Sequence, residues 1–173
     1  MTPEFKNGAV DQPGIRDVFA TVLETVTSAI TGAAKGPEGA GAVTEVVKSA
    51  ARGAVGMGSD LVPGSKAIVM GVVRGTGEKG DAALKLVSHT AKTVIHHTAD
   101  MGGDLAAATK GLVLGAIASA KHMGVDSAQA ASMAAQDALE GAKETSSVTG
   151  ERVLGALKEP IGGIKVALPQ LSK

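Results

Sequence analysis

The sequence predicts an all-α protein, an antiparallel array of six to seven short helices on a 22/44-residue repeat. Apolar residues follow helical spacing over most of the chain, and the composition combines 24 Gly and abundant Ala with only 2 Phe and no Tyr or Trp. Helices with such small side chains are expected to pack tightly, as an α-solenoid or a bundle built from repeats. The repeat is marked by glycines every 22 residues, namely Gly14, Gly36, Gly58, Gly80, Gly102 and Gly124.

An acidic residue follows most of these glycines. It comes two residues later at Glu38, Asp60, Asp104 and Asp126, and one residue later at Asp81. Glycine is preferred in the left-handed conformation just past a helix end, and Asp is a strong N-cap for the next helix. Each Gly-x-Asp segment therefore predicts a short turn between antiparallel helices, and capping explains the acids.

These signals predict a succession of helices joined by tight turns. Val22, Val26 and Ile30 mark the buried face of the first helix, whereas Ser88, His89, Lys92 and His96 form a polar face on the fourth. The glycine spacing stops at Ser146, so we expect a disordered lead (1–13), a helical repeat domain (14–146), and a short capping helix with a C-terminal strap (147–173). The expected helices span about 15–34, 40–57, 104–122 and 151–158; a third helix reaches to about 78, a fourth starts at 81 and a sixth starts at 126.

The chain also matches itself at a spacing of 44 residues. Met57-Gly-Ser-Asp-Leu61 corresponds to Met101-Gly-Gly-Asp-Leu105, and Gly71 corresponds to Gly115. The doubled period predicts that alternate helices have different surroundings, as in two layers. Glycines also recur inside helices, at Gly53, Gly75 and Gly141. Because glycine costs about 1 kcal/mol there, we expect a neighbouring helix, or alternatively a ligand in a groove, to pass close by.

Charge and composition exclude several classes of function. Lys plus Arg and Asp plus Glu are 17 each, which argues against nucleic acid as a partner. No apolar run approaches the roughly 18 residues of a transmembrane span, and no secretory signal precedes the first helix, so a cytoplasmic protein is expected. With no Cys, there is neither a disulfide framework nor a thiol nucleophile.

Catalytic and metal-binding motifs are also missing. The four histidines, His89, His96, His97 and His122, form no His-x3-His or Glu-x-x-His pair, so surface or capping roles are expected. The segment 71–77 is glycine-rich but lacks the Gly-Lys-Ser/Thr of a phosphate-binding loop. We therefore expect no enzyme activity, no cofactor and no metal.

The helix at 104–122 is apolar nearly all round, which places it between neighbouring helices or against a second subunit. The primary hypothesis is a structural or scaffolding protein that self-associates into a homo-oligomer or filament. Its expected self-association face comprises Leu105, Leu112, Val113, Gly115, Ala116 and Ile117.

Two alternatives remain open. The 22-residue period resembles that of exchangeable apolipoproteins, and the Ala-rich helices resemble those of phasin-like granule coats; these resemblances imply a coat on a lipid or polymer granule. The first extends to the period alone, because these helices are broken by Gly-x-Asp and their faces are weakly charged. The other alternative is a carrier that holds an apolar small molecule in a groove lined by Gly and Ala.

Overall fold

A computed structural model describes residues 15–34, 39–56 and 61–168. Over these residues all regular secondary structure is helical, which confirms the all-α prediction. The expected lead, the turns at Gly36 and Gly58 and the last five residues lie outside the described residues. The seven described helices are α2 (Ile15–Ala34), α3 (Gly39–Gly56), α4 (Leu61–Thr76), α5 (Gly80–Asp100), α6 (Leu105–Met123), α7 (Ser127–Thr145) and α8 (Ser147–Leu157).

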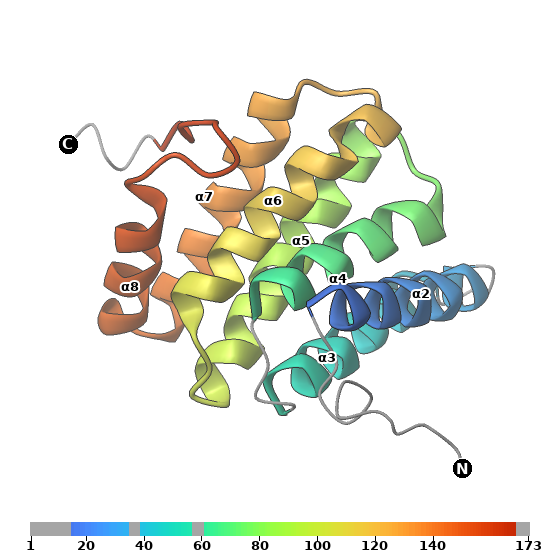
Figure 1. Cartoon of the computed structure of the whole chain (residues 1–173), viewed down its shortest axis with the longest axis horizontal. Coiled ribbons are helices and arrows are strands. Elements are labelled where there is room, and N and C mark those ends of the chain that lie inside the picture. Colours follow the sequence, from blue (N-terminus) through green and yellow to red (C-terminus); the bar gives the residue numbers. More distant parts are fainter. Residues whose placement is uncertain (1–14, 35–38, 57–60, 169–173) are drawn as a thin grey trace, which may run out of the picture.

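The helices pack mainly against those two places away along the chain. Helix α4 lies between α2 and α6, while α5 lies between α3 and α7. Consecutive helices also contact each other across the two rows, and α8 packs on both α6 and α7. Figure 1 shows the result: α2 and α3 form one end of the molecule, and α7 and α8 form the other.

Two of the predicted Gly-x-Asp turns have the expected geometry. Gly102 and Gly124 are left-handed, with φ of 69° and 72°. The Asp104 and Asp126 carboxylates each accept a hydrogen bond of 3.1 Å from the backbone N–H three residues later. These caps satisfy N–H groups that the first helical turn leaves without a partner, a contribution of about 1 kcal/mol each.

The turn between α4 and α5 differs from the prediction. Helix α4 ends at Thr76, and Gly77 follows it in the left-handed conformation, with φ of 69°. Gly80 is also left-handed, with φ of 56°, but it lies at the start of α5. Helix α5 then begins at Gly80, so Asp81 lies in its first turn rather than at its N-cap, which is Lys79. Asp81 was wrongly predicted as a cap, although its charge still suits the positive end of the helix.

The end of the glycine spacing also has a local cause. Ser146 is extended, with φ of −171°, and its hydroxyl accepts a 3.1 Å hydrogen bond from Thr149 N–H. A serine cap therefore replaces the left-handed turn, and α8 begins at Ser147, four residues before the expected start at 151.

Glycines allow the helices within each row to approach closely. A Cβ on Gly75 would lie 2.6 Å from Cγ2 of Ile30, and one on Gly115 would lie 2.8 Å from the carbonyl oxygen of Lys66. Close helix crossing is thus confirmed at Gly75, and at Gly141, which meets the α5 backbone at 3.2 Å. The prediction is wrong at Gly53, which has no described atom within 4 Å of the Cβ position.

Residues 161–168 cover the α7–α8 end of the molecule. Ile161 and Ile164 exchange two backbone hydrogen bonds around the left-handed pair Gly162 and Gly163. The chain then runs along α7, where Gln136 Nε2 donates to the Ala167 carbonyl and Ala167 N–H donates to Ser132 Oγ. Three apolar side chains of this segment, Ile161, Val166 and Leu168, are buried.

Candidate interaction surface

Helix α6 lies inside a single chain. Five residues of the expected self-association face, Leu105, Leu112, Val113, Gly115 and Ala116, are buried among α4, α5, α7 and α8. The sixth, Ile117, is partly buried, and its Cδ1 would lie 3.1 Å from a Cβ on Gly162. Packing within one chain therefore accounts for the apolar character of α6. A contact with a second subunit would have to use another surface.

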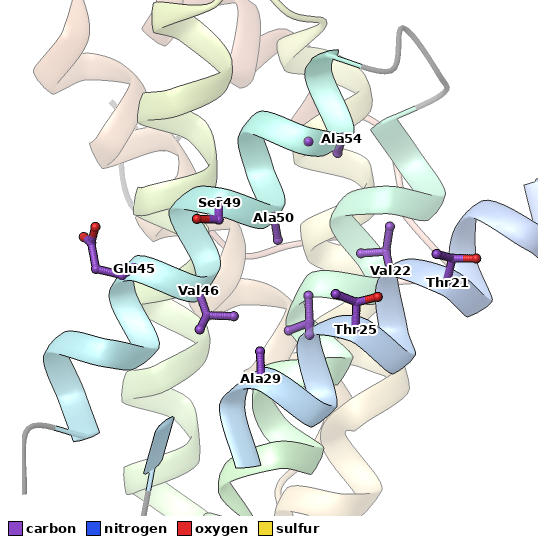
Figure 2. Close-up of a pocket in the computed structure, with 11 residues that line it drawn as sticks. Thr21, Val22, Thr25, Ala29, Glu45, Val46, Ser49, Ala50 and Ala54 are labelled. Atoms are coloured by element: carbon purple, nitrogen blue, oxygen red, sulfur yellow. The ribbon is translucent and has the colours of Figure 1, made fainter. Parts of the chain in front are cut away.

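An apolar groove of about 440 Å³ lies between α2 and α3 (Figure 2). In Figure 2, Val46 and Ala50 of α3 and Ala29 of α2 point into the space between the two helices, whereas Glu45 points away toward solvent. The lining residues are Thr21, Val22, Thr25, Val26, Ala29, Glu45, Val46, Ser49, Ala50, Gly53 and Ala54. The groove thus lies at the end of the molecule opposite α8.

The side of α3 that lines the groove can be compared with the equivalent side of α5, the next helix in its row, which is covered. The residues 44 positions after Val46 and Ala50 are Thr90 and Val94, and both are buried. Helix α3 packs on α5, where Thr44 Oγ1 lies 2.8 Å from His89 Nε2. Val46 and Ala50 remain partly exposed because no described helix precedes α3 in the row. We therefore call the α2–α3 surface around the groove the open end.

Charged residues flank the groove on α3. Glu45 is exposed and lies 3.1 Å from Lys48, one helical turn later. Arg52 is also exposed and lies seven residues after Glu45, so both side chains emerge from nearly the same side of the helix. The rim of the open end therefore carries the Glu45–Lys48 ion pair toward the start of α3 and Arg52 toward its end.

A polar cluster joins α5 to α7 on the solvent side. Lys92 Nζ lies 2.6 Å from Glu140 Oε1 and 3.1 Å from Glu144 Oε1, and His96 Nε2 lies 3.2 Å from Glu144 Oε2. Hydrogen bonds from the Lys92 ammonium hold the pKa of Glu144 below its ordinary value. Hydrogen bonds to Glu140 and Glu144 raise the pKa of Lys92. The cluster therefore links α5 to α7 through side chains of both helices.

This cluster predicts a shallow dependence of stability on pH. The contribution of Glu144 is present above its ordinary pKa of 4.5 and is lost as the pH falls through the lower folded-state value. That of Lys92 is present below 10.5 and is lost as the pH rises through its higher folded-state value. We expect Lys92→Met to lower the urea midpoint slightly at neutral pH and to flatten its decline in acid, because exposed ion pairs contribute little. An acid limb identical to that of the wild type contradicts this assignment.

The histidines and the other acids are dispersed. His89 contacts Thr44, His96 contacts Glu144, and the carbonyl of His122 accepts a hydrogen bond from Lys79. Over the described ranges, no group of three or more His, Cys, Asp or Glu side chains has the geometry to hold a metal ion. A second hollow, of about 380 Å³, lies beside α2 and is bordered by Phe19, Glu24 and Arg74.

The fold defines an all-α protein with helices in two interleaved rows and one open end. No protein-family model, curated protein or solved structure matches this chain. Among the described helices, none has the length and apolar character needed to cross a bilayer.

Proposed function

We propose that this is a non-enzymatic structural protein that self-associates through its open end. The proposal rests on the apolar groove between α2 and α3. The groove exposes a side of α3 whose equivalent on α5 is buried. A partner that covers Val46 and Ala50 removes apolar surface from water, which is the main driving force for association. This surface replaces the α6 face as the proposed site.

The proposal includes a 22/44-residue repeat with α-solenoid-like stacking. Gly71 and Gly115, 44 residues apart, both face the helix two places earlier: Gly71 meets Val26 and Gly115 meets Val69. In such a stack, each repeat depends on its neighbours to bury its apolar sides, and a terminal repeat needs a cap. Residues 161–168 supply the cap at the α7–α8 end, and a second chain supplies it at the open end.

Sedimentation velocity over a wide range of protein concentration tests self-association. We expect the sedimentation coefficient to rise with concentration as monomers associate. A coefficient that corresponds to one chain at every concentration rejects the proposal.

The same groove favours a carrier as the second candidate function. Its lining is apolar apart from Thr21, Thr25, Ser49 and Glu45, and its volume suits a small apolar ligand. A fluorescent apolar dye that binds the wild type at one molecule per chain, and does not bind the Ala50→Arg variant, supports this candidate. The granule-coat hypothesis remains a prediction, which flotation with liposomes tests directly.

A further inference from the structure

We infer that self-association is head to head: two copies join their open ends about a two-fold axis, with the two α3 helices antiparallel. This inference rests on the proposed function and specifies its geometry. Three features of the described residues support it: the closed far end, the charges on α3, and the space at Gly53.

The two ends of the molecule are not equivalent. At the far end, α8 packs on α6 and α7, and residues 161–168 bury Ile161, Val166 and Leu168 against the helices. An open end that must cover its apolar groove therefore finds the matching apolar surface on the open end of another copy. Contact between identical surfaces is closed by a two-fold axis, which gives a dimer and excludes a growing filament.

The charges at the rim select the orientation of the two α3 helices. Glu45 and Arg52 are separated by roughly 10 Å along the helix, at 1.5 Å per residue. An antiparallel partner whose axis passes near Ser49 sets Glu45 of each copy against Arg52 of the other. Lys48, the ion-pair partner of Glu45, lies close to Lys48 of the other copy in either orientation and so does not distinguish them. A parallel partner sets Glu45 against Glu45, and such like-charge contacts disfavour binding.

Space for close approach exists at Gly53. The equivalent glycines 22 residues onward at Gly75, and further along at Gly141, receive a neighbouring helix at 2.6 Å and 3.2 Å from the Cβ position. At Gly53 no described atom lies within 4 Å. An antiparallel α3 of the partner copy fills this space and brings the two helix backbones together.

Analytical ultracentrifugation of the full chain tests this arrangement with a matched pair of variants. Gly53 and Gly155 are both exposed helical glycines with open space at the Cβ position, so an arginine is accommodated at each without displacing its surroundings. We expect the wild type and Gly155→Arg to form dimers, and Gly53→Arg to raise the dimer dissociation constant by about a hundredfold through steric exclusion and charge repulsion. Circular dichroism verifies that both variants remain folded.

A charge exchange tests the orientation separately. Glu45→Arg and Arg52→Glu are each expected to raise the dissociation constant by about tenfold, because each places like charges in contact twice in the symmetric dimer. The double variant Glu45→Arg/Arg52→Glu is expected to restore most of the affinity. Failure of this rescue overturns the antiparallel arrangement.

Other outcomes separate this inference from the proposed function. A monomer at every concentration rejects self-association itself. Association that Gly53→Arg leaves unchanged, or that continues beyond two copies, retains self-association but overturns the head-to-head dimer. A chain that dimerises only after removal of residues 1–14 also overturns it, because the N-terminal segment is then the occupant of the open end.

Discussion

Gly115→Ala is expected to lower the free energy of unfolding by about 1–3 kcal/mol, the usual range for overpacking a core. The new methyl group would lie 2.8 Å from both the Lys66 carbonyl oxygen and Val69 Cβ. Neither atom can move without shifting the α4 backbone against α6. The higher helix propensity of alanine, about 1 kcal/mol, offsets only part of this loss.

Gly155→Ala provides the control, because Gly155 lies in α8 with open space at its Cβ position. We expect this variant to be more stable than the wild type by about 0.5–1 kcal/mol. Urea unfolding at one fixed protein concentration measures both variants, since dimerisation would otherwise contribute to the apparent stability. Equal effects at Gly115 and Gly155 would show that close crossing does not determine where glycine is needed.

Leu112→Ala is expected to cost about 2–5 kcal/mol, the range for a leucine removed from a packed core. Leu112 is fully buried within one chain, so the truncation leaves a cavity beside α4. The loss is expected in the unfolding of the monomer, measured well below the concentration at which copies associate.

This variant also distinguishes a core position from an association face. If Leu112 lies at a contact between subunits, truncation weakens association and leaves the monomer nearly as stable as the wild type. Val148→Ala is the matched comparison, because Val148 is 58% exposed and its truncation is expected to change stability by less than about 0.5 kcal/mol.

The helices were largely predictable because the helical spacing of apolar residues and the Gly and Asp residues at the turns indicate the same boundaries. The expected helix at 15–34 matches the observed bounds, and the Asp104 and Asp126 turns have the expected caps. The turn before α5 was not predictable from the 22-residue spacing, since Gly77 and Gly80 are both glycines. Both are left-handed in the structure, so the presence of a glycine does not by itself show where α4 ends.

The candidate surface could not be predicted from the sequence for a related reason. Val46 and Ala50 have the helical spacing of ordinary core residues, and only the arrangement of the helices shows that this side of α3 lacks a neighbour. Conversely, α6 looked like an interface because the sequence does not show that four other helices pack on it. The α5–α7 cluster had a detectable signal, because Ser88, Lys92 and His96 recur every four residues on one face of α5, and their partners Asp137, Glu140 and Glu144 recur every three or four residues on α7.

The interleaved packing has a consequence for how the protein is made. Each helix contacts a helix that was synthesised roughly 45 residues earlier, as Gly71 does with Val26 and Gly141 with Lys92. Helices can therefore add one at a time to those that have already emerged from the ribosome. In each intermediate, the last helix of a row exposes an apolar side until the next helix covers it. Residues 161–168 pack on α7 through Gln136 and Ser132, so the α7–α8 end can be covered only after α7 has formed.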